Sequence, residues 1–473
     1  MMRAGLALLL VVAYASATTM AMAHGDEHAS AQVPVRGLAL RRRLGTLPVT
    51  SYLHGVPVLR AATKTTKSFL VRFVSARAMA VACKAGRHVI GGACTAQYPL
   101  LHCSLFVSDE AESVQKLAAH LGPKLVSLVE QDDDFVGLGV SAVATSETQA
   151  SNSSNATDCP WGVDRINQSQ LPLDGQCQRG GRGGAGVRVF VIDSGVNRAH
   201  NEFRGRIVDS ADFVDGTHED CQGHGSHVAG TALGSSFGVA PKATLVPVRV
   251  LDCNGSSTTS IVLEGINYVA ETIKKSPHQP SVAVLSLGGI RSALLNAVIR
   301  DLVASNIVVV AAAGNVASDV RYFSPASEAA VLTVSASTRD DSLATFSNFG
   351  QGVDLIAPGE AIRSAWMGEA NASKIVSGTS MAAPHAAGVA ARLLSRAHAN
   401  GKSLSSKQVM SAMIACAERD VIQNLQEERG TPNLLLRIPC SMMAKVVQGS
   451  KSNASAPGPV SPVVPGPVAP AVS

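Results

Sequence analysis

Short apolar runs alternate with helical patterns through residues 187–397. The runs at 187–192, 248–252 and 308–313 have the length and the β-branched or small composition of buried strands. Helical stretches occupy residues 261–274, 293–305 and 380–397. Strands that alternate with helices predict an α/β fold built on a doubly wound, mostly parallel sheet.

The first part of the chain has a different pattern. Residues 69–74 and 124–130 are typical of strands and residues 112–121 of an amphipathic helix, which predicts a small α+β domain at about 67–143. Residues 24–66 show no sustained periodicity. A linker rich in Ser, Thr, Ala and Asn at 141–157 leads into the α/β domain, expected at 144–440. The low-complexity tail at 441–473 cannot bury a core, and we expect it to be disordered.

Residues 1–23 have the features of a secretory signal: Arg3, an apolar stretch at 6–14 and Ala21-Met22-Ala23 at the end. The stretch is too short to span a bilayer and no other segment is long enough, so we expect no membrane span. The net charge of +5 is spread along the chain, which disfavours nucleic acid as a partner. Of the nine cysteines, six lie in the α/β region and suit disulfides of a secreted protein. The absence of any C-x-x-C pair argues against zinc.

Four side chains in separate short motifs suggest nucleophilic catalysis. Ser380 follows Gly-Thr at the start of a predicted helix, with Pro384 expected in its first turn. A serine needs a base and an orienting acid, and His224 and Asp193 supply these residue types. Asn315 follows an apolar strand and has an amide that can donate to an oxyanion. Each alone could be a cap or turn residue; together, in the order Asp, His, Asn, Ser, they favour a catalytic site.

These motifs resemble those of the subtilisin-like serine proteases, and within them the proteinase K subfamily. The resemblance covers about residues 160–439 and rests on FVIDSGV, GHGSHVAGT, SLGG, AAAGN and SGTSMAAPH. The chain order Asp, His, Ser is that of subtilisin. The resemblance implies Asp193 as orienting acid, His224 as general base and Ser380 as nucleophile, with the amide of Asn315 and the backbone N–H of Ser380 as oxyanion donors. One small departure is a serine at position 226, where the family usually has threonine.

The same resemblance implies further sites. Two strand edges would hold an extended substrate, and a roomy pocket would give broad specificity with apolar or aromatic preference; the residues are Ser286, Leu287, Gly288, Gly255 and Ser256 for the edges and Ala312, Ala313 and Gly314 for the pocket. A structural calcium ion would be held by the carbonyls of Ala329 and Val331 and the carboxylate of Asp354. A disulfide would join Cys221 to Cys253. The pairs Cys159–Cys177 and Cys416–Cys440 are predicted only from proximity in the sequence.

Residues 67–143 resemble the inhibitor-type propeptide of this protease family, whose C-terminal strand would lie along residues 286–288. We therefore expect a secreted, monomeric endopeptidase made as a self-processing zymogen. Its partners would be protein and peptide substrates and its own propeptide as inhibitor. Two alternatives remain: a self-cleaved binding protein that acts through a partner, and a processing protease with dibasic specificity. N-x-[ST] sequons, which would be glycosylation sites in a eukaryote, begin at Asn152, Asn155, Asn167, Asn254, Asn371 and Asn453.

Overall fold

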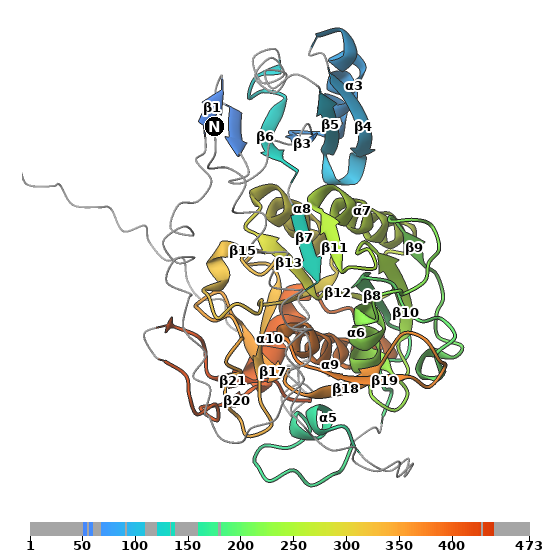
Figure 1. The fold of residues 1–473 in the computed structure, drawn as a ribbon, viewed down its shortest axis with the longest axis vertical. Helices are drawn as coiled ribbons and strands as arrows, with labels where there is room; N and C mark the ends of the chain where they lie inside the picture. Colours follow the sequence, from blue (N-terminus) through green and yellow to red (C-terminus); the bar gives the residue numbers. More distant parts are fainter. Residues whose placement is uncertain are drawn as a thin grey trace, which may run out of the picture. The chain divides into compact units, whose positions relative to one another are not determined.

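The central element of the fold is a nine-stranded sheet. The computed structural model describes residues 51–53, 56–59, 68–89, 92–108, 121–132, 134–137, 159–177, 181–426 and 429–438. The strands are β8 (Arg188–Asp193), β9 (Ala211–Asp212), β10 (Thr244–Arg249), β12 (Ser281–Leu285), β14 (Val308–Ala312), β16 (Leu332–Ser337), β17 (Leu355–Pro358), β20 (Glu418–Arg419) and β21 (Leu434–Leu435). They lie in the order β20-β21-β17-β16-β14-β12-β8-β10-β9, and all neighbours are parallel except β20 and β21 (Figure 1). The predicted α/β fold with a mostly parallel sheet is confirmed.

Helices cover both faces of this sheet, and β8 shows how. Val189 and Val191 belong to the core shared with α6 (His224–Leu233) and α9 (Thr379–Ala399). Phe190 and Ile192 belong to the core shared with α7 (Thr259–Lys275) and α8 (Ala293–Ala304). Successive side chains of a strand point to opposite faces, so a fully apolar run is required where both faces are buried.

Small residues let α6 and α9 pack closely. A Cβ at Gly388 of α9 would lie 2.8 Å from the carbonyl oxygen of Ala232 in α6, and one at Gly230 of α6 would lie 2.3 Å from Ser364 Oγ in the neighbouring segment 362–365. The remaining helices of the α/β part are α5 (Trp161–Arg165) and α10 (Ser406–Cys416), and a hairpin is formed by β18 (Ile362–Ala365) and β19 (Ser373–Val376). None of the helices in the described ranges is long and apolar enough to cross a membrane.

One strand boundary differs from the prediction. The strand expected at 248–252 is β10, which begins at Thr244 and ends at Arg249. The next residues leave the ladder because the backbone N–H groups of Val250 and Leu251 donate to the carbonyl of Asp193 at 2.8 and 3.2 Å. The apolar run therefore continues past the strand.

A second sheet forms the small N-terminal domain. Its strands are β1 (Ser51–Leu53), β2 (Val56–Leu59), β3 (Ser68–Phe73), β4 (Gly92–Tyr98), β5 (Cys103–Ser108) and β6 (Val126–Gln131), in the order β1-β2-β6-β3-β5-β4. The two predicted strands correspond to β3 and β6, whereas helix α3 (Ala76–Val89), β4 and β5 were not predicted. The sheet also begins upstream of residue 67, where the small domain was predicted to start. Strands β1 and β2 were missed because they are too short to give a periodic pattern. Residues 112–120 of the helix predicted at 112–121, the signal segment, the linker at 141–157 and the tail at 441–473 lie outside the described residues.

The disulfides agree with the two testable pairings. Cys221 is bonded to Cys253 and Cys159 to Cys177. Cys416 is also disulfide-bonded, while Cys440, the partner predicted for it, lies outside the described residues. Sequence analysis assigned no pairing to the three remaining cysteines: Cys83 bonds to Cys94, and Cys103 is a buried free thiol.

Candidate active site

The carboxyl end of β8 and the start of α6 bring Asp193 and His224 together. The strand ends at Asp193 and the helix begins at His224. Asp193 Oδ1 lies 2.8 Å from His224 Nδ1 and also accepts a hydrogen bond from the backbone N–H of Ser194 at 2.8 Å. Both side chains are buried. This geometry fixes the imidazole ring so that Nε2 is the nitrogen left for chemistry.

The charges around His224 raise its pKa. Burial alone lowers the pKa of His224, but the negative charge of Asp193, the hydrogen bond to it and the charge of Asp220 raise it more, so the pKa lies above its ordinary value. His224 Nε2 is buried and makes no hydrogen bond to the described residues. A histidine in this setting can take up a proton at Nε2 and hold it.

Ser380 is the second residue of α9, behind Gly378 at the cap position. Its Oγ donates to the carbonyl of Ser286 at 3.1 Å. The hydroxyl must leave this acceptor before it can pass its proton to His224. The structure thus brings the predicted nucleophile to the end of the sheet without a hydrogen bond to the base.

Pro384 was predicted in the first turn of this helix, and this placement was wrong. The helix begins at Thr379, so Pro384 lies in its interior. Proline has no N–H for the carbonyl four residues earlier, which is that of Ser380. That carbonyl instead accepts from the Oγ of Ser286 at 3.0 Å. Ser286 and Ser380 therefore hold each other through two reciprocal hydrogen bonds.

Asn315 follows β14 and faces the start of α9. Its Oδ1 accepts from the backbone N–H and from the hydroxyl of Thr379, both at 2.8 Å. Because the amide oxygen is held by Thr379, the amide nitrogen points the other way. Thr379, a residue that sequence analysis did not single out, thus fixes the orientation of the predicted oxyanion donor beside Ser380.

The predicted substrate edges flank a strand of the chain itself. Strand β7 (Asp134–Gly137) lies between β11 (Ser256–Thr258) and β13 (Leu287–Ile290), antiparallel to both. Val136 is paired with Ser256 on one side and with Gly288 on the other, and the N–H of Gly137 donates to the carbonyl of Gly255 at 2.8 Å. Segments at 255–258 and 287–290 therefore bind an extended peptide through main-chain hydrogen bonds.

The end of β7 lies beside the base. A Cβ built on Gly137 would be 3.8 Å from His224 Nδ1. At the other end of the strand Phe135 is buried, and a Cβ on Gly289 would come within 3.1 Å of its ring. Strand β7 therefore runs between β11 and β13 and ends beside His224.

The predicted pocket residues lie where β14 ends. Ala312 and Ala313 are buried, and Gly314 has φ +107, which favours glycine. A Cβ on Gly314 would also lie 2.2 Å from Asn348 Nδ2. These contacts account for small residues here, and the role of the three residues in specificity stays a prediction.

Of the residues predicted to hold calcium, Asp354 has a feature that a cation would favour. Asp354 Oδ2 accepts from the N–H of Thr333 at 2.8 Å, yet burial raises the pKa of Asp354 to about 6. A cation would offset this cost of charge burial. No group of three or more His, Cys, Asp or Glu side chains gathers as a metal site in the described ranges, so a site here depends on the carbonyls of Ala329 and Val331.

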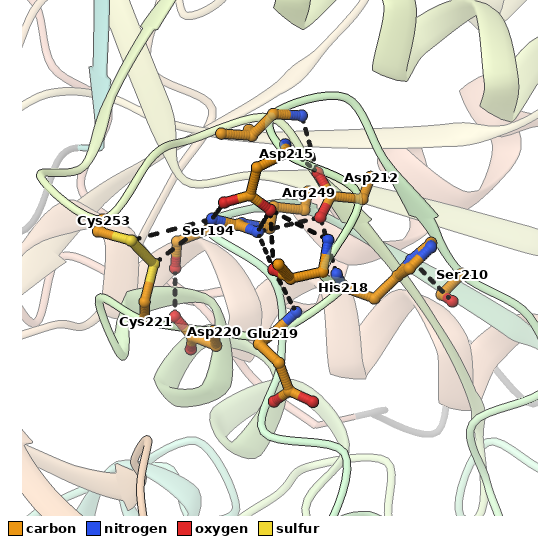
Figure 2. A network of polar contacts seen from close by, with 12 residues as sticks. Ser194, Ser210, Asp212, Asp215, His218, Glu219, Asp220, Cys221, Arg249 and Cys253 are labelled. Atoms are coloured by element: carbon orange, nitrogen blue, oxygen red, sulfur yellow. Dashed lines mark hydrogen bonds and ion pairs between the residues drawn. A yellow bond between two sulfur atoms is a disulfide. The ribbon is translucent and has the colours of Figure 1, made fainter.

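A polar network that sequence analysis missed surrounds the turn before His224 (Figure 2). Arg249 is buried and pairs with Asp212 and Asp215, and its guanidinium lies 3.4 Å from the Sγ of Cys221. Figure 2 also shows Ser194 and Asp220 facing each other, with Ser194 Oγ 2.9 Å from Asp220 Oδ1. The residues of this polar network come from separate segments of the chain and lie close together only in the folded protein.

A buried Asp–His pair and a serine at a helix start, all at the carboxyl end of a parallel sheet, define a serine hydrolase. The model of the subtilase family (Peptidase_S8) matches residues 184–435. The chain belongs to this family and is a serine endopeptidase.

Individual relatives agree with this assignment. The chain is 40% identical over 327 residues to "Extracellular serine proteinase" of Thermus sp. (strain Rt41A), covering 69% of this chain and 73% of the relative. It is 40% identical over 326 residues to "Alkaline serine exoprotease A" of Vibrio alginolyticus, covering 68% of this chain and 58% of that protein. The crystal structure of a cold adapted subtilisin-like serine proteinase superposes with a TM-score of 0.55 at 42% identity, covering 60% of this chain and 99% of that one.

Proposed function

We propose that the chain is a secreted endopeptidase of broad specificity, made as a zymogen that cuts itself. The observation that carries this proposal is β7, which occupies the groove between β11 and β13 and ends beside His224. A strand bound in this way has the geometry of a product that has not yet left. The secretory pattern of residues 1–23 and the disulfides support export.

The catalytic roles follow from the positions of the four side chains. Ser380 Oγ attacks the carbonyl carbon of the scissile bond while its proton passes to His224 Nε2. Asp193 stabilises the imidazolium, and the oxyanion accepts from the Asn315 amide and the Ser380 N–H. His224 then gives the proton to the leaving amine, and water releases the acyl group by the same steps.

The small domain is attached to the protease part by two carboxylates at helix N-termini. Asp132 accepts from the N–H and Oγ of Ser260 in the first turn of α7, at 2.9 and 2.7 Å. Glu130 accepts from the N–H of Leu294 in the first turn of α8 at 3.0 Å. A negative charge is stabilised at the N-terminus of a helix. These contacts would keep the small domain bound after the chain is cut, so that β7 inhibits the enzyme.

We expect the first cut within a residue or two of Gly137, because the backbone reaches the base there. The cut enzyme should then stay inactive for a lag period until the small domain is lost. The double substitution Glu130→Gln and Asp132→Asn should shorten that lag by about 10²-fold, because the amides keep an acceptor oxygen but remove two negative charges at helix N-termini, each of which contributes about 1–2 kcal/mol when partly buried. The lag is measured as the interval between chain cleavage on a gel and hydrolysis of an added peptide.

The buried thiol of Cys103 provides an independent readout of domain release. Cys103 belongs to the core that the small domain shares with α7 and α8, so it should react with a thiol reagent only after dissociation. Ser127→Ala, an exposed change on β6, is the matched control. Activity that appears at once on cleavage in the wild type, with Cys103 still protected, would contradict the inhibitor role.

Calcium at Asp354 should decide which melts at the higher temperature, the wild type or the Asp354→Asn variant. In excess calcium, the wild type should melt at a higher temperature than Asp354→Asn, since a ligand that binds only the native state stabilises it. In a chelator at pH 8 the order should reverse. The pKa of Asp354 is raised to about 6 in the folded state, so the protonated carboxyl group stabilises the fold. This stabilisation is fully present below the unfolded pKa of about 3.9 and is lost as the pH rises through 6. A wild-type melting curve that chelation does not move would rule out the site.

A further inference from the structure

Asp220 is a buried carboxylate that the catalytic steps above do not use. Its side chain is 6% exposed, and it lies four residues before His224. Oδ1 accepts from Ser194 Oγ at 2.9 Å, Gln222 N at 3.1 Å and Gly223 N at 2.7 Å. Oδ2 accepts from the N–H and Oγ of Ser226 at 2.9 and 2.6 Å. Two of these partners, Gly223 and Ser226, bracket His224 in the chain.

All five partners donate to Asp220. Backbone N–H groups can only donate. Ser194 Oγ already accepts from the N–H of Gly225 at 2.9 Å, and Ser226 Oγ from the N–H of Asn197 at 2.8 Å, which leaves both hydroxyl protons available for Asp220. Burial raises the pKa of Asp220, while its hydrogen bonds with Ser226, Gly223 and Ser194 favour the ionised form. We therefore assign Asp220 the ionised form.

Asp220 also takes over the N-terminal cap of α6. The cap residue Gly223 has no side chain and φ +94. The N–H of Ser226, which a capping side chain normally satisfies, bonds to Asp220 instead. Ser194, the residue that follows Asp193, also donates to this carboxylate (Figure 2). The two catalytic segments are thus joined through one carboxylate.

We propose that Asp220 is a positioning residue for His224, which holds the turn that carries the imidazole and supplies a second buried negative charge beside it. The proposal rests on the assignment of His224 as general base. In the reaction, the imidazolium formed when Ser380 loses its proton would be stabilised by Asp220 as well as by Asp193.

Other charged and titratable groups surround this region without supplying that negative charge. Burial lowers the pKa of His227 on α6 to about 3 and that of His385 on α9 to about 4, so both are neutral near pH 7. Arg249 on β10 is neutralised by Asp212 and Asp215. Two further groups lie on neighbouring strands: Lys374 on β19, over the ring of Trp366, and Asp134 at the far end of β7. The negative charges that raise the pKa of His224 are those of Asp193 and Asp220.

The test is the pH dependence of kcat/KM for a small peptide substrate, measured on the matured enzyme. Asp220→Asn keeps the shape but removes the charge and turns an amide N–H₂ toward the donors of Ser226. The proposal predicts a roughly tenfold lower kcat, because one hydrogen bond to a charged group is lost. It also predicts that the acid limb moves to lower pH by roughly half to one unit, since the imidazolium loses a stabilising charge.

Ser226→Ala is the matched control, because it removes one hydrogen bond to Asp220 and the acceptor of the Asn197 N–H, but no charge. Its acid limb should stay at the wild-type pH. An acid limb of Asp220→Asn at the wild-type pH overturns the proposal, since a loss of packing alone would not move it. If Asp220→Asn does not fold, Asp220→Glu replaces it: the proposal then expects a lower kcat with an unmoved acid limb, and a wild-type kcat overturns it. A His224→Ala enzyme that keeps wild-type activity would instead refute the proposed function.

Discussion

Replacing Ser380 with alanine is expected to abolish peptide hydrolysis and to leave the precursor uncut. The loss should be on the order of 10⁶ in kcat, because a catalytic triad acts as a unit and the remaining residues cannot replace the nucleophile. His224→Ala should cost a similar factor. Hydrolysis is followed with a chromogenic peptide, and self-cleavage is followed by the mass of the purified chain.

The control for this variant is Ser395→Ala, which removes another buried serine of the same helix. Ser395 Oγ donates to the carbonyl of Ala185, away from the site. That variant should cut itself and turn over peptide as the wild type does. The alternative of a self-cleaved binding protein predicts that the wild type cuts itself and yet hydrolyses no added peptide.

Asn315→Ala should lower kcat by roughly 10²–10³ with little change in KM. The amide donates to the oxyanion, which exists in the transition state and not in the bound substrate. The variant should also be less stable, because Thr379 loses the acceptor of two hydrogen bonds. Steady-state kinetics on enzyme counted by active-site titration separate the two effects.

Asn315→Asp is the companion variant. It keeps an oxygen for Thr379 and removes the N–H₂ donor. If the donor matters, this variant should be at least as slow as Asn315→Ala while it retains more of the stability. A kcat at the wild-type level in either variant would show that Asn315 only shapes the turn after β14.

The proposed catalytic residues could be picked out because each lies in a short motif at a strand end or a helix start. Asp193 directly follows the apolar run at 187–192 and is the last residue of β8, Asn315 follows the strand β14, and Ser380 lies in the first turn of α9. These features depend on neighbours in the sequence, which a single chain displays directly.

Features that depend on distant segments were harder to predict. Strand β7 is four residues long after an acidic run, and it is extended because β11 and β13 pair with it. The carbonyl of Ser380 finds Ser286 only because Pro384 falls inside the helix. No local pattern marks Asp220, and its five donors come together only in the folded chain. The Cys83–Cys94 bond likewise follows from the packing of α3 against β4, neither of which has a clear pattern.

The central claim, that Ser380 is the nucleophile of an endopeptidase activated by His224, is tested most directly by covalent labelling. The matured protein is treated with a fluorophosphonate, digested and analysed by peptide mass spectrometry while hydrolysis of a peptide substrate is followed in parallel. We expect one adduct on Ser380, loss of activity in proportion to labelling, and no adduct in His224→Ala on the same timescale. An adduct on another residue, or full peptide hydrolysis by protein labelled at Ser380, would contradict it.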